Sequence, residues 1–160
     1  MKKMIKKTLK EIGFQPDTKY EFDIYFTNNK EELNKEQTTI YVEDLNEVDN
    51  IYNGLQYSYQ YGGFITISLY DIYNKFNNTG TWYYKHIKNT DKELFLNELK
   101  TIKSNNIFLS FIANGYTTLF DAEDASNTII NNNKESSYLA AYPIISEEQI
   151  KIYEAIILYK

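Results

Sequence analysis

Residues 107–122 read IFLSFIANGYTTLFDA, with Asn114 and Gly115 between two stretches rich in apolar residues. Apolar side chains recur at alternate positions in these stretches, which is typical of strands with one buried face. An Asn-Gly pair readily takes the positive φ angles of a two-residue turn. The segment therefore predicts a β-hairpin. Its pairing would place five side chains on the buried face: Ile107, Leu109, Phe111, Tyr116 and Phe120.

Further strands are expected on both sides of this segment. Gly62-Gly63 separates two more stretches and predicts a second hairpin over residues 55–69. Its register would place three tyrosines on one face: Tyr57, Tyr59 and Tyr61. Alternation and β-branched or aromatic content predict single strands at residues 20–26, 38–43, 82–87 and 138–142, the last at an edge of the sheet.

Helix start signals occur between these strands. Thr90 and Glu93 form a capping box ahead of a helix over residues 91–103. Asp44 and Glu47 form a similar pair before residues 45–52, which are expected to be helical. A strand is the alternative for 45–52, because the Asn-Gly pair that follows is also a hairpin signal. A short helix is expected at 69–77, and the polar residues 123–136 are expected to form a loop.

Two amphipathic helices are expected at the ends of the chain. Isoleucine and leucine spaced i, i+4, i+7 among lysines predict a basic helix over residues 2–12, ended by Gly13. A capping pair, Ser146 and Gln149, predicts a closing helix over 147–159. The basic helix within 1–13 is expected to pack on the acidic remainder of the chain.

These elements indicate a single α+β domain over residues 1–160. Strands and helices follow one another irregularly and include hairpins, which favours a mainly antiparallel sheet with about three to four helices. The length of 160 residues suits one domain that buries a sizeable core without disulfides or metals.

The composition excludes several classes of site. The chain has 17 lysines, no arginine, one histidine and no cysteine. Disulfides, thiolate metal sites and multi-histidine metal sites are therefore excluded. The excess of lysine, asparagine, isoleucine and tyrosine indicates a low-GC genome, such as that of a bacterium or phage. No apolar stretch is long enough for a signal peptide core or a membrane span, so we expect a cytoplasmic protein.

The charge pattern favours a basic protein as the partner. The net charge is −5, and residues 17–49 carry ten acids against three lysines, a balance of −7. An acidic surface disfavours nucleic acid and steers basic proteins toward itself. The candidate partner-binding residues are Glu43, Asp44, Glu47, Asp49, Tyr57, Tyr59 and Tyr61. The alternative is that the acids maintain solubility and the tyrosines cover the core.

No motif assigns a catalytic residue, a cofactor or a metal site. His86 is the one histidine, and a catalytic role would require an orienting carboxylate and a nucleophile near it in space. Residues 121–132 lack the glycine and the final glutamate of an EF-hand loop. The second hypothesis is nevertheless a small-ligand-binding protein or enzyme, with a pocket around His86, Tyr83 and the acids of 91–93 or 121–124.

The leading hypothesis is a small intracellular inhibitor that occludes a basic partner. In being small, acidic and free of catalytic motifs, the chain resembles bacterial immunity proteins and phage anti-defence proteins, although no sequence motif supports that resemblance.

Overall fold

The structure is a computed structural model that describes residues 3–12, 19–33, 36–77, 80–145 and 150–160. These residues form one sheet of eight strands in the order β1-β2-β3-β5-β8-β6-β7-β4. The strands are β1 (Met4–Ile12), β2 (Lys19–Thr27), β3 (Thr38–Tyr41), β4 (Gly63–Ile65), β5 (Gly80–Asn89), β6 (Asn106–Phe111), β7 (Ser137–Pro143) and β8 (Tyr153–Tyr159). The helices are α1 (Val48–Gln60), α2 (Leu69–Phe76), α3 (Lys92–Leu99) and α4 (Leu119–Asn132), with short 3-10 turns η1 (Lys30–Glu32) and η2 (Leu45–Glu47).

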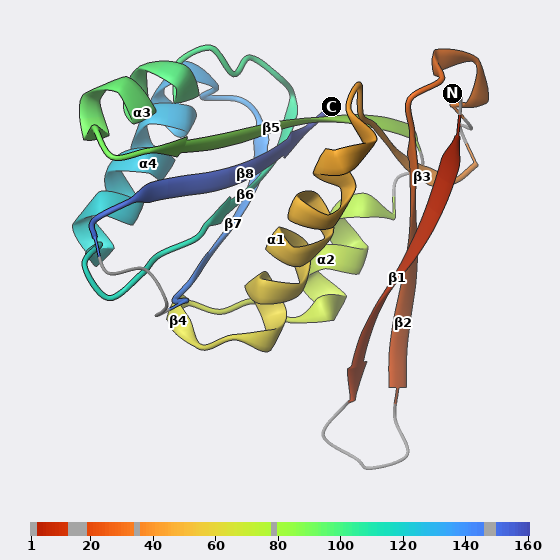
Figure 1. Cartoon of the computed structure of the whole chain (residues 1–160), viewed down its shortest axis with the longest axis horizontal. Coiled ribbons are helices and arrows are strands. Elements are labelled where there is room, and N and C mark those ends of the chain that lie inside the picture. The colour runs from red at the N-terminus through yellow and green to blue at the C-terminus, as the bar shows by residue number, and fades with distance from the viewer. Residues whose placement is uncertain (1–2, 13–18, 34–35, 78–79, 146–149) are drawn as a thin grey trace.

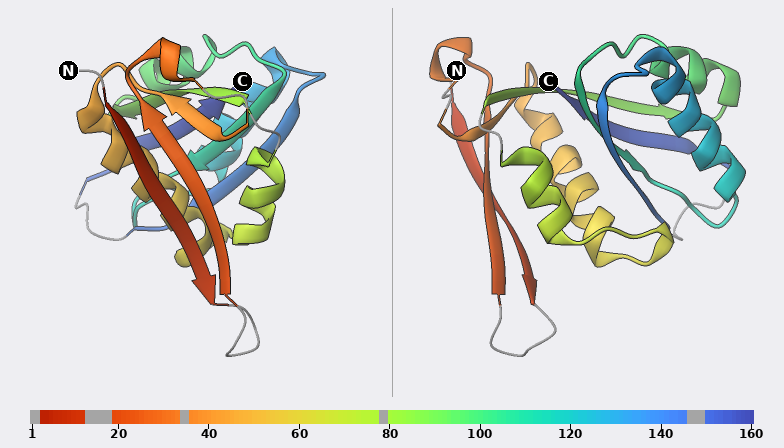
Figure 2. Two further views of the ribbon diagram at one scale, coloured as in Figure 1. Left: turned by 90° about the vertical axis from the view of Figure 1, so that its right-hand side faces the viewer. Right: turned by 180° about the vertical axis from the view of Figure 1, so that it is seen from behind.

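The elements stack in layers (Figure 1). Helices α3 and α4 cover one face of the sheet formed by β5, β8, β6 and β7, and α1 and α2 cover the other. The antiparallel pair β1–β2 folds back over α1 and α2, so these two helices lie between two parts of one curved sheet (Figure 2). Strand β3 joins the two parts by pairing in parallel with both β2 and β5.

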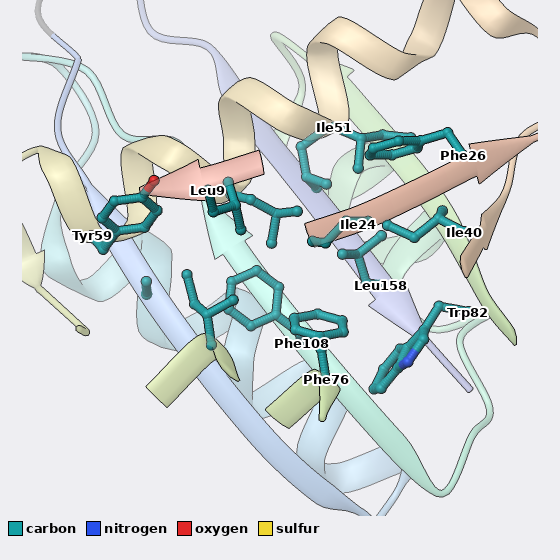
Figure 3. Packing of buried hydrophobic residues seen from close by; sticks show 14 of the residues in the cluster. Leu9, Ile24, Phe26, Ile40, Ile51, Tyr59, Phe76, Trp82, Phe108 and Leu158 are labelled. Atoms are coloured by element: carbon teal, nitrogen blue, oxygen red, sulfur yellow. The ribbon is translucent and has the colours of Figure 1, made fainter. Parts of the chain in front are cut away.

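Two hydrophobic clusters fill the layers. The larger cluster lies around α1 and α2 and includes Phe76, Trp82 and Phe108 (Figure 3). The second cluster lies under α3 and α4 and is built around Phe95 and Phe111. Strand β8 contributes alternate residues to each cluster, because both of its faces are covered.

The α+β class is confirmed, with a mixed sheet. Four strand pairings are antiparallel, and three are parallel. The strands expected at 20–26, 38–43, 82–87 and 138–142 are present as β2, β3, β5 and β7, and the helices expected at 45–52, 69–77 and 91–103 are present in α1, α2 and α3. Strand β7 is not at the edge, because β4 pairs with its outer side.

The closing helix predicted over 147–159 is wrong, since β8 occupies residues Tyr153–Tyr159. The strand lies in the middle of the sheet, between β5 and β6, and Ala155, Ile156, Ile157 and Leu158 are all buried. A strand buried on both faces reads as a continuous apolar run, which periodicity cannot distinguish from a buried helix. The predicted capping pair of this helix lies outside the described residues.

The basic helix predicted over 2–12 is also wrong, because these residues form the edge strand β1. Ile5 and Leu9 are four residues apart, a spacing that places two side chains on one face of a strand as well as of a helix. Leu9 is fully buried, and Ile5 packs against the same cluster. Lysines on an edge strand discourage pairing with another chain, which accounts for the charge of this segment.

The hairpin predicted over 55–69 is wrong. Its first half forms the end of α1, and β4, in its second half, pairs with β7 instead. Gly54 lets this helix approach β8, because a Cβ atom at Gly54 would lie 2.8 Å from Cγ1 of Ile156. Ser58 and Ser110 each donate a hydrogen bond to the Gly54 carbonyl oxygen, at 2.8 and 3.1 Å. The Asn-Gly signal at this point therefore marks close packing of a helix on the sheet rather than a turn.

The second half of the 107–122 hairpin is wrong as well. Strand β6 is present, but Thr118 and Asp121 form a capping box that starts α4. This helix includes much of the predicted 123–136 loop, and it buries Ala122, Ala125 and Ile129 on one side. Phe120 was expected in the core and is instead 74% exposed. The spacing of the buried residues, i, i+3 and i+7, is that of an amphipathic helix.

Two tyrosines of α1 satisfy backbone groups of the edge strand β1. The Tyr52 hydroxyl donates to the carbonyl oxygen of Thr8 at 2.8 Å, and the amide of Lys10 donates to the Tyr59 hydroxyl at 3.2 Å. Burial raises the pKa of Tyr59 to about 12, so this hydroxyl stays protonated at neutral pH. Helix α1 thus provides hydrogen-bond partners for backbone groups of β1 on the side that does not pair with β2.

Replacing Tyr59 with phenylalanine is expected to lower the free energy of unfolding by about 1 kcal/mol, because the Lys10 amide loses its partner. Urea denaturation measures the change. Tyr61→Phe is the matched control at the C-cap of the same helix: Tyr61 is 47% exposed, and we expect a change within about 0.5 kcal/mol. Equal losses in the two variants would refute the role of the edge contact.

Candidate functional site

His86 lies in the middle of β5 with a carboxylate on each side. Its Nδ1 atom is 3.2 Å from Oε2 of Glu47, at the end of η2, and its Nε2 atom is 2.7 Å from Oε2 of Glu154, on β8. The three side chains are largely buried, with exposed fractions of 18%, 29% and 21% for His86, Glu47 and Glu154. The contacts join the start of α1 to the centre of the sheet.

The two carboxylates favour the charged imidazolium of His86. A neutral imidazole has one N–H and would turn a lone pair toward one carboxylate, whereas the imidazolium donates to both. The hydrogen bond to Glu154 raises the pKa of His86, burial lowers it, and the charge of Glu154 and the contact with Glu47 add to the increase, so the pKa lies above its ordinary value. Both ring nitrogens are engaged, which leaves neither free to act as a base or to bind a metal.

His86 is expected to make stability depend on pH. Its folded pKa is raised above the unfolded value of 6.5, so its stabilisation is complete below pH 6.5 and is lost as pH rises through the folded pKa. The slope should approach but not exceed about 1.4 kcal/mol per pH unit. Denaturation between pH 5.5 and about 8 measures it; above that range Lys75, whose pKa burial lowers to about 8, acts in the opposite direction.

The control for this pH dependence is His86→Ala, which should remove the slope. Because the chain has one histidine, its ring protons give a single NMR titration curve that reports the folded pKa directly. A measured pKa at or below 6.5 would contradict the ion-pair account.

Two hollows meet at His86. The first, of about 180 Å³, lies between α1, β8 and residues 112–114. We call it the amide hollow, because three asparagines line it with Tyr57, Glu154 and several isoleucines: Asn50, Asn53 and Asn114. Asn50 and Asn53 present one side of α1 to this space, one helical turn apart. Its lining includes no serine, threonine or cysteine.

The second hollow, of about 440 Å³, lies where the segment after β3 separates from β5. We call its wall the tyrosine face: Tyr41, Glu43, Glu47, Tyr83, Tyr84 and Tyr159. The ring centroids of Tyr41 and Tyr83 are 6.2 Å apart, and those of Tyr83 and Tyr159 are 6.0 Å apart, so three adjacent strands carry a row of rings. Lys30 also lines the hollow, with Nζ 5.2 Å from the Tyr41 ring centroid.

Acidic charges surround Tyr84 in this hollow. The pKa of Tyr84 is raised, first by burial and then by the charges of Glu47, Asp44 and Glu43. These acids lie in a short segment that leads from β3 into α1, and Asp44 accepts a hydrogen bond from the Asn46 amide at 2.9 Å to start η2. Glu43, Asp44 and Glu47 are close in the sequence, and they therefore also lie close together on the surface.

The predicted acids do not share one role. Glu43 and Glu47 are on the tyrosine face, and Glu47 also holds His86. Asp44 caps η2. Asp49 lies on α1, 3.4 Å from Nζ of Lys7, with 78% of its side chain exposed.

The predicted tyrosines do not share a face. Tyr59 is buried against β1, whereas Tyr57 lines the amide hollow and packs edge-on against Tyr61, with ring centroids 5.2 Å apart. Positions 57 and 61 are one helical turn apart, and position 59 lies on the opposite side of α1. The prediction that residues 57, 59 and 61 share one strand face is therefore wrong.

Sequence reasoning missed Tyr41, Tyr84 and Tyr159, and it missed Glu154 as the partner of His86. The predicted pocket acids of 91–93 and 121–124 lie elsewhere. Lys92 contacts Asp121 and Asp124 at 2.9 and 2.7 Å, and Lys151 contacts Asp121 at 3.1 Å, which ties α3 to α4. Burial would raise the pKa of Asp121, but hydrogen bonds from Lys92, the Thr118 amide and Lys151 lower it to about 2.

The described residues hold neither a cluster of metal ligands nor a helix that could span a membrane. Among the described residues, no group of three or more histidine, aspartate and glutamate side chains is placed to hold a metal ion. No helix in the described part of the chain is long and apolar enough to cross a membrane.

The comparisons with known proteins concern the fold. No known protein family matches the chain, and no curated protein matches it. Among solved structures, the chain is similar to an empty FtsZ dimer from M. jannaschii, with a TM-score of 0.64 and 13% identity over 78% of this chain and 46% of the FtsZ chain. A mutant FtsZ from the same organism gives a TM-score of 0.64 and 13% identity over 79% of this chain and 48% of that one. The chain thus spans about half the length of these FtsZ chains, and at this identity the likeness shows the fold alone.

Proposed function

We propose that the chain is a cytoplasmic protein-binding module that inhibits or neutralises a basic protein partner. The observation that carries the proposal is the tyrosine face, where four tyrosines and two glutamates line one open hollow. Tyrosine offers a large rigid contact area with a hydroxyl group, and it is enriched at protein interfaces. A negative potential around such rings favours a partner with lysines or arginines at its own binding surface.

The exposure of the rings supports this surface. Tyr83, in the middle of the row, is 39% exposed, and Tyr41 and Tyr159 flank it on neighbouring strands. A partner side chain placed over Tyr83 would lie against the row of three rings, and Glu43 and Glu47 line the same hollow. Inhibition would follow if this partner surface included its active site.

The amide hollow supports a second candidate, a small-ligand-binding protein. It is concave, it lies beside His86, and it offers amide and carboxylate groups together with apolar walls. At about 180 Å³ it is smaller than the usual ligand pocket of about 300–1,000 Å³. Exchange of Asn53, which lines the amide hollow and not the tyrosine face, for alanine discriminates the candidates. Ligand binding in the amide hollow should change, whereas partner binding at the rings should be retained.

Affinity capture from a lysate of the native host tests the main proposal. The chain should retain a basic protein at low salt and release it as salt rises, because exposed charges are screened. The double variant Tyr41→Ala, Tyr83→Ala should lose that protein. The matched control, Tyr116→Ala with Phe120→Ala, removes rings that are 55% and 74% exposed outside the face and should retain it. Retention by all variants would overturn the proposed surface.

A further inference from the structure

A third hollow lies between β2 and the first turn of α2, apart from His86 and the tyrosine face. Its volume is about 210 Å³, and its walls are mostly apolar. We call this space the aromatic hollow. It is lined by Tyr20, Glu21, Phe22, Leu69, Tyr70 and Tyr73. Helix α2 lies beside β2 (Figure 2), which brings rings from positions about 50 residues apart in the chain together.

The rings of this hollow are unusually exposed. Tyr20, Tyr70 and Tyr73 are 46%, 59% and 43% exposed. Phe22 and Tyr73 stand edge to face, with ring centroids 5.6 Å apart and an angle of 88° between their planes. The faces of aromatic rings are electron-rich and attract cations, so several exposed rings around one space suit a cationic occupant.

The charges near the hollow also favour a cation, but one without N–H groups. The carboxylate of Glu11 accepts the Leu69 amide at 2.8 Å, that of Asp71 accepts the Ser68 amide at 2.8 Å, and that of Glu21 lies 3.9 Å from Nζ of Lys10. These acids add negative potential, yet each already has a partner. A primary ammonium would lose its hydration without gaining acceptors, whereas a methylated ammonium has no N–H group to satisfy.

We infer that the aromatic hollow binds a small molecule carrying a trimethylammonium group. A cavity of about 150 Å³ holds a benzene ring, so a trimethylammonium group and part of its stem fit the 210 Å³ present here. The rings contact the methyl groups, and the surrounding acids stabilise the charge. A ligand with its own carboxylate is disfavoured by the same acids. The site is independent of the proposed partner surface.

Calorimetric titration with choline and with 3,3-dimethylbutan-1-ol tests the inference, because the two probes share a shape and differ in charge. Choline should bind at least about fivefold more tightly than the neutral alcohol, which lies within the range of measured cation–π effects. Glycine betaine should bind more weakly than choline. Tyr70→Leu and Tyr20→Leu should each weaken choline binding, and Tyr83→Leu, on the tyrosine face, should not.

Three results would overturn the inference. Equal binding of choline and the neutral alcohol would show an apolar site without charge selection. Choline binding that is unchanged in both Tyr70→Leu and Tyr20→Leu would place the ligand elsewhere. If a trimethyl-lysine dipeptide bound more tightly than choline, the ligand of this hollow would be a protein with a trimethylated lysine and not a small molecule. None of these results bears on capture of the basic partner.

Discussion

Replacing Phe76 with alanine is expected to lower the free energy of unfolding by about 3–5 kcal/mol. Phe76 is fully buried at the end of α2, and its ring centroid lies 4.5 Å from that of Trp82 and 5.7 Å from that of Phe108 (Figure 3). The substitution would leave a cavity where α2 meets the sheet. Typical total stabilities are about 5–15 kcal/mol, so this one change should remove a large part of the stability.

Urea denaturation followed by fluorescence measures the loss, and Trp82, the one tryptophan, reports on this cluster directly. Phe120→Ala is the matched control, since its ring is 74% exposed and should change stability by no more than about 0.5 kcal/mol. A loss below about 1 kcal/mol for Phe76→Ala would mean that α2 does not pack on the sheet in this way.

Reversing two of the predicted partner-binding acids, one on the tyrosine face and one on the exposed side of α1, is expected to slow association with the basic partner by about tenfold at low salt. The variant Glu43→Lys, Asp49→Lys changes two exposed side chains and spares Glu47, which His86 requires. The Asp49–Lys7 pair is on the surface, so its loss should have little effect on folding. The dissociation rate should change less than the association rate, and the salt dependence should become flatter.

Glu123→Lys, Glu135→Lys is the control for net charge. It alters the total charge by the same amount at two exposed positions, on and just after α4. Stopped-flow or surface-based kinetics at several salt concentrations compares the two variants. Equal slowing by both would attribute the effect to total charge and would remove Glu43 and Asp49 from the mechanism.

Local patterns in the sequence predicted the strands and helices that bury one face and expose the other. Phe22, Ile24 and Phe26 of β2 point to one cluster, and their alternation with polar residues is the ordinary sign of a half-buried strand. Capping residues act within one turn, and they located the starts of α1 and α3 to within a few residues, although the N-cap of α3 is Asp91 rather than Thr90. The capping pair at 146 and 149 predicted a helix where the strand β8 lies. Strand β8 was missed for the opposite reason, since its two buried faces erase the alternation.

The candidate site was predictable only in part. The acids of residues 43–49 are close in sequence, so their shared surface follows from the chain itself. The contacts of His86 join positions 39 and 68 residues apart, and the tyrosine row comes from three strands. No local periodicity carries such information, because the pairing of β3, β5 and β8 determines which tyrosines become neighbours.

The affinity of the captured partner for Tyr83→Ala, compared with Tyr116→Ala, tests the central claim most directly. Tyr83 lies in the middle of the ring row, and Tyr116 is an exposed tyrosine outside it. Calorimetry at physiological salt should give a dissociation constant at least about 30-fold higher for Tyr83→Ala, as expected for a residue at the centre of an interface. Tyr116→Ala should stay within about twofold of the unchanged chain. Equal affinities for the two variants would contradict the account, because the partner would then bind without the tyrosine face.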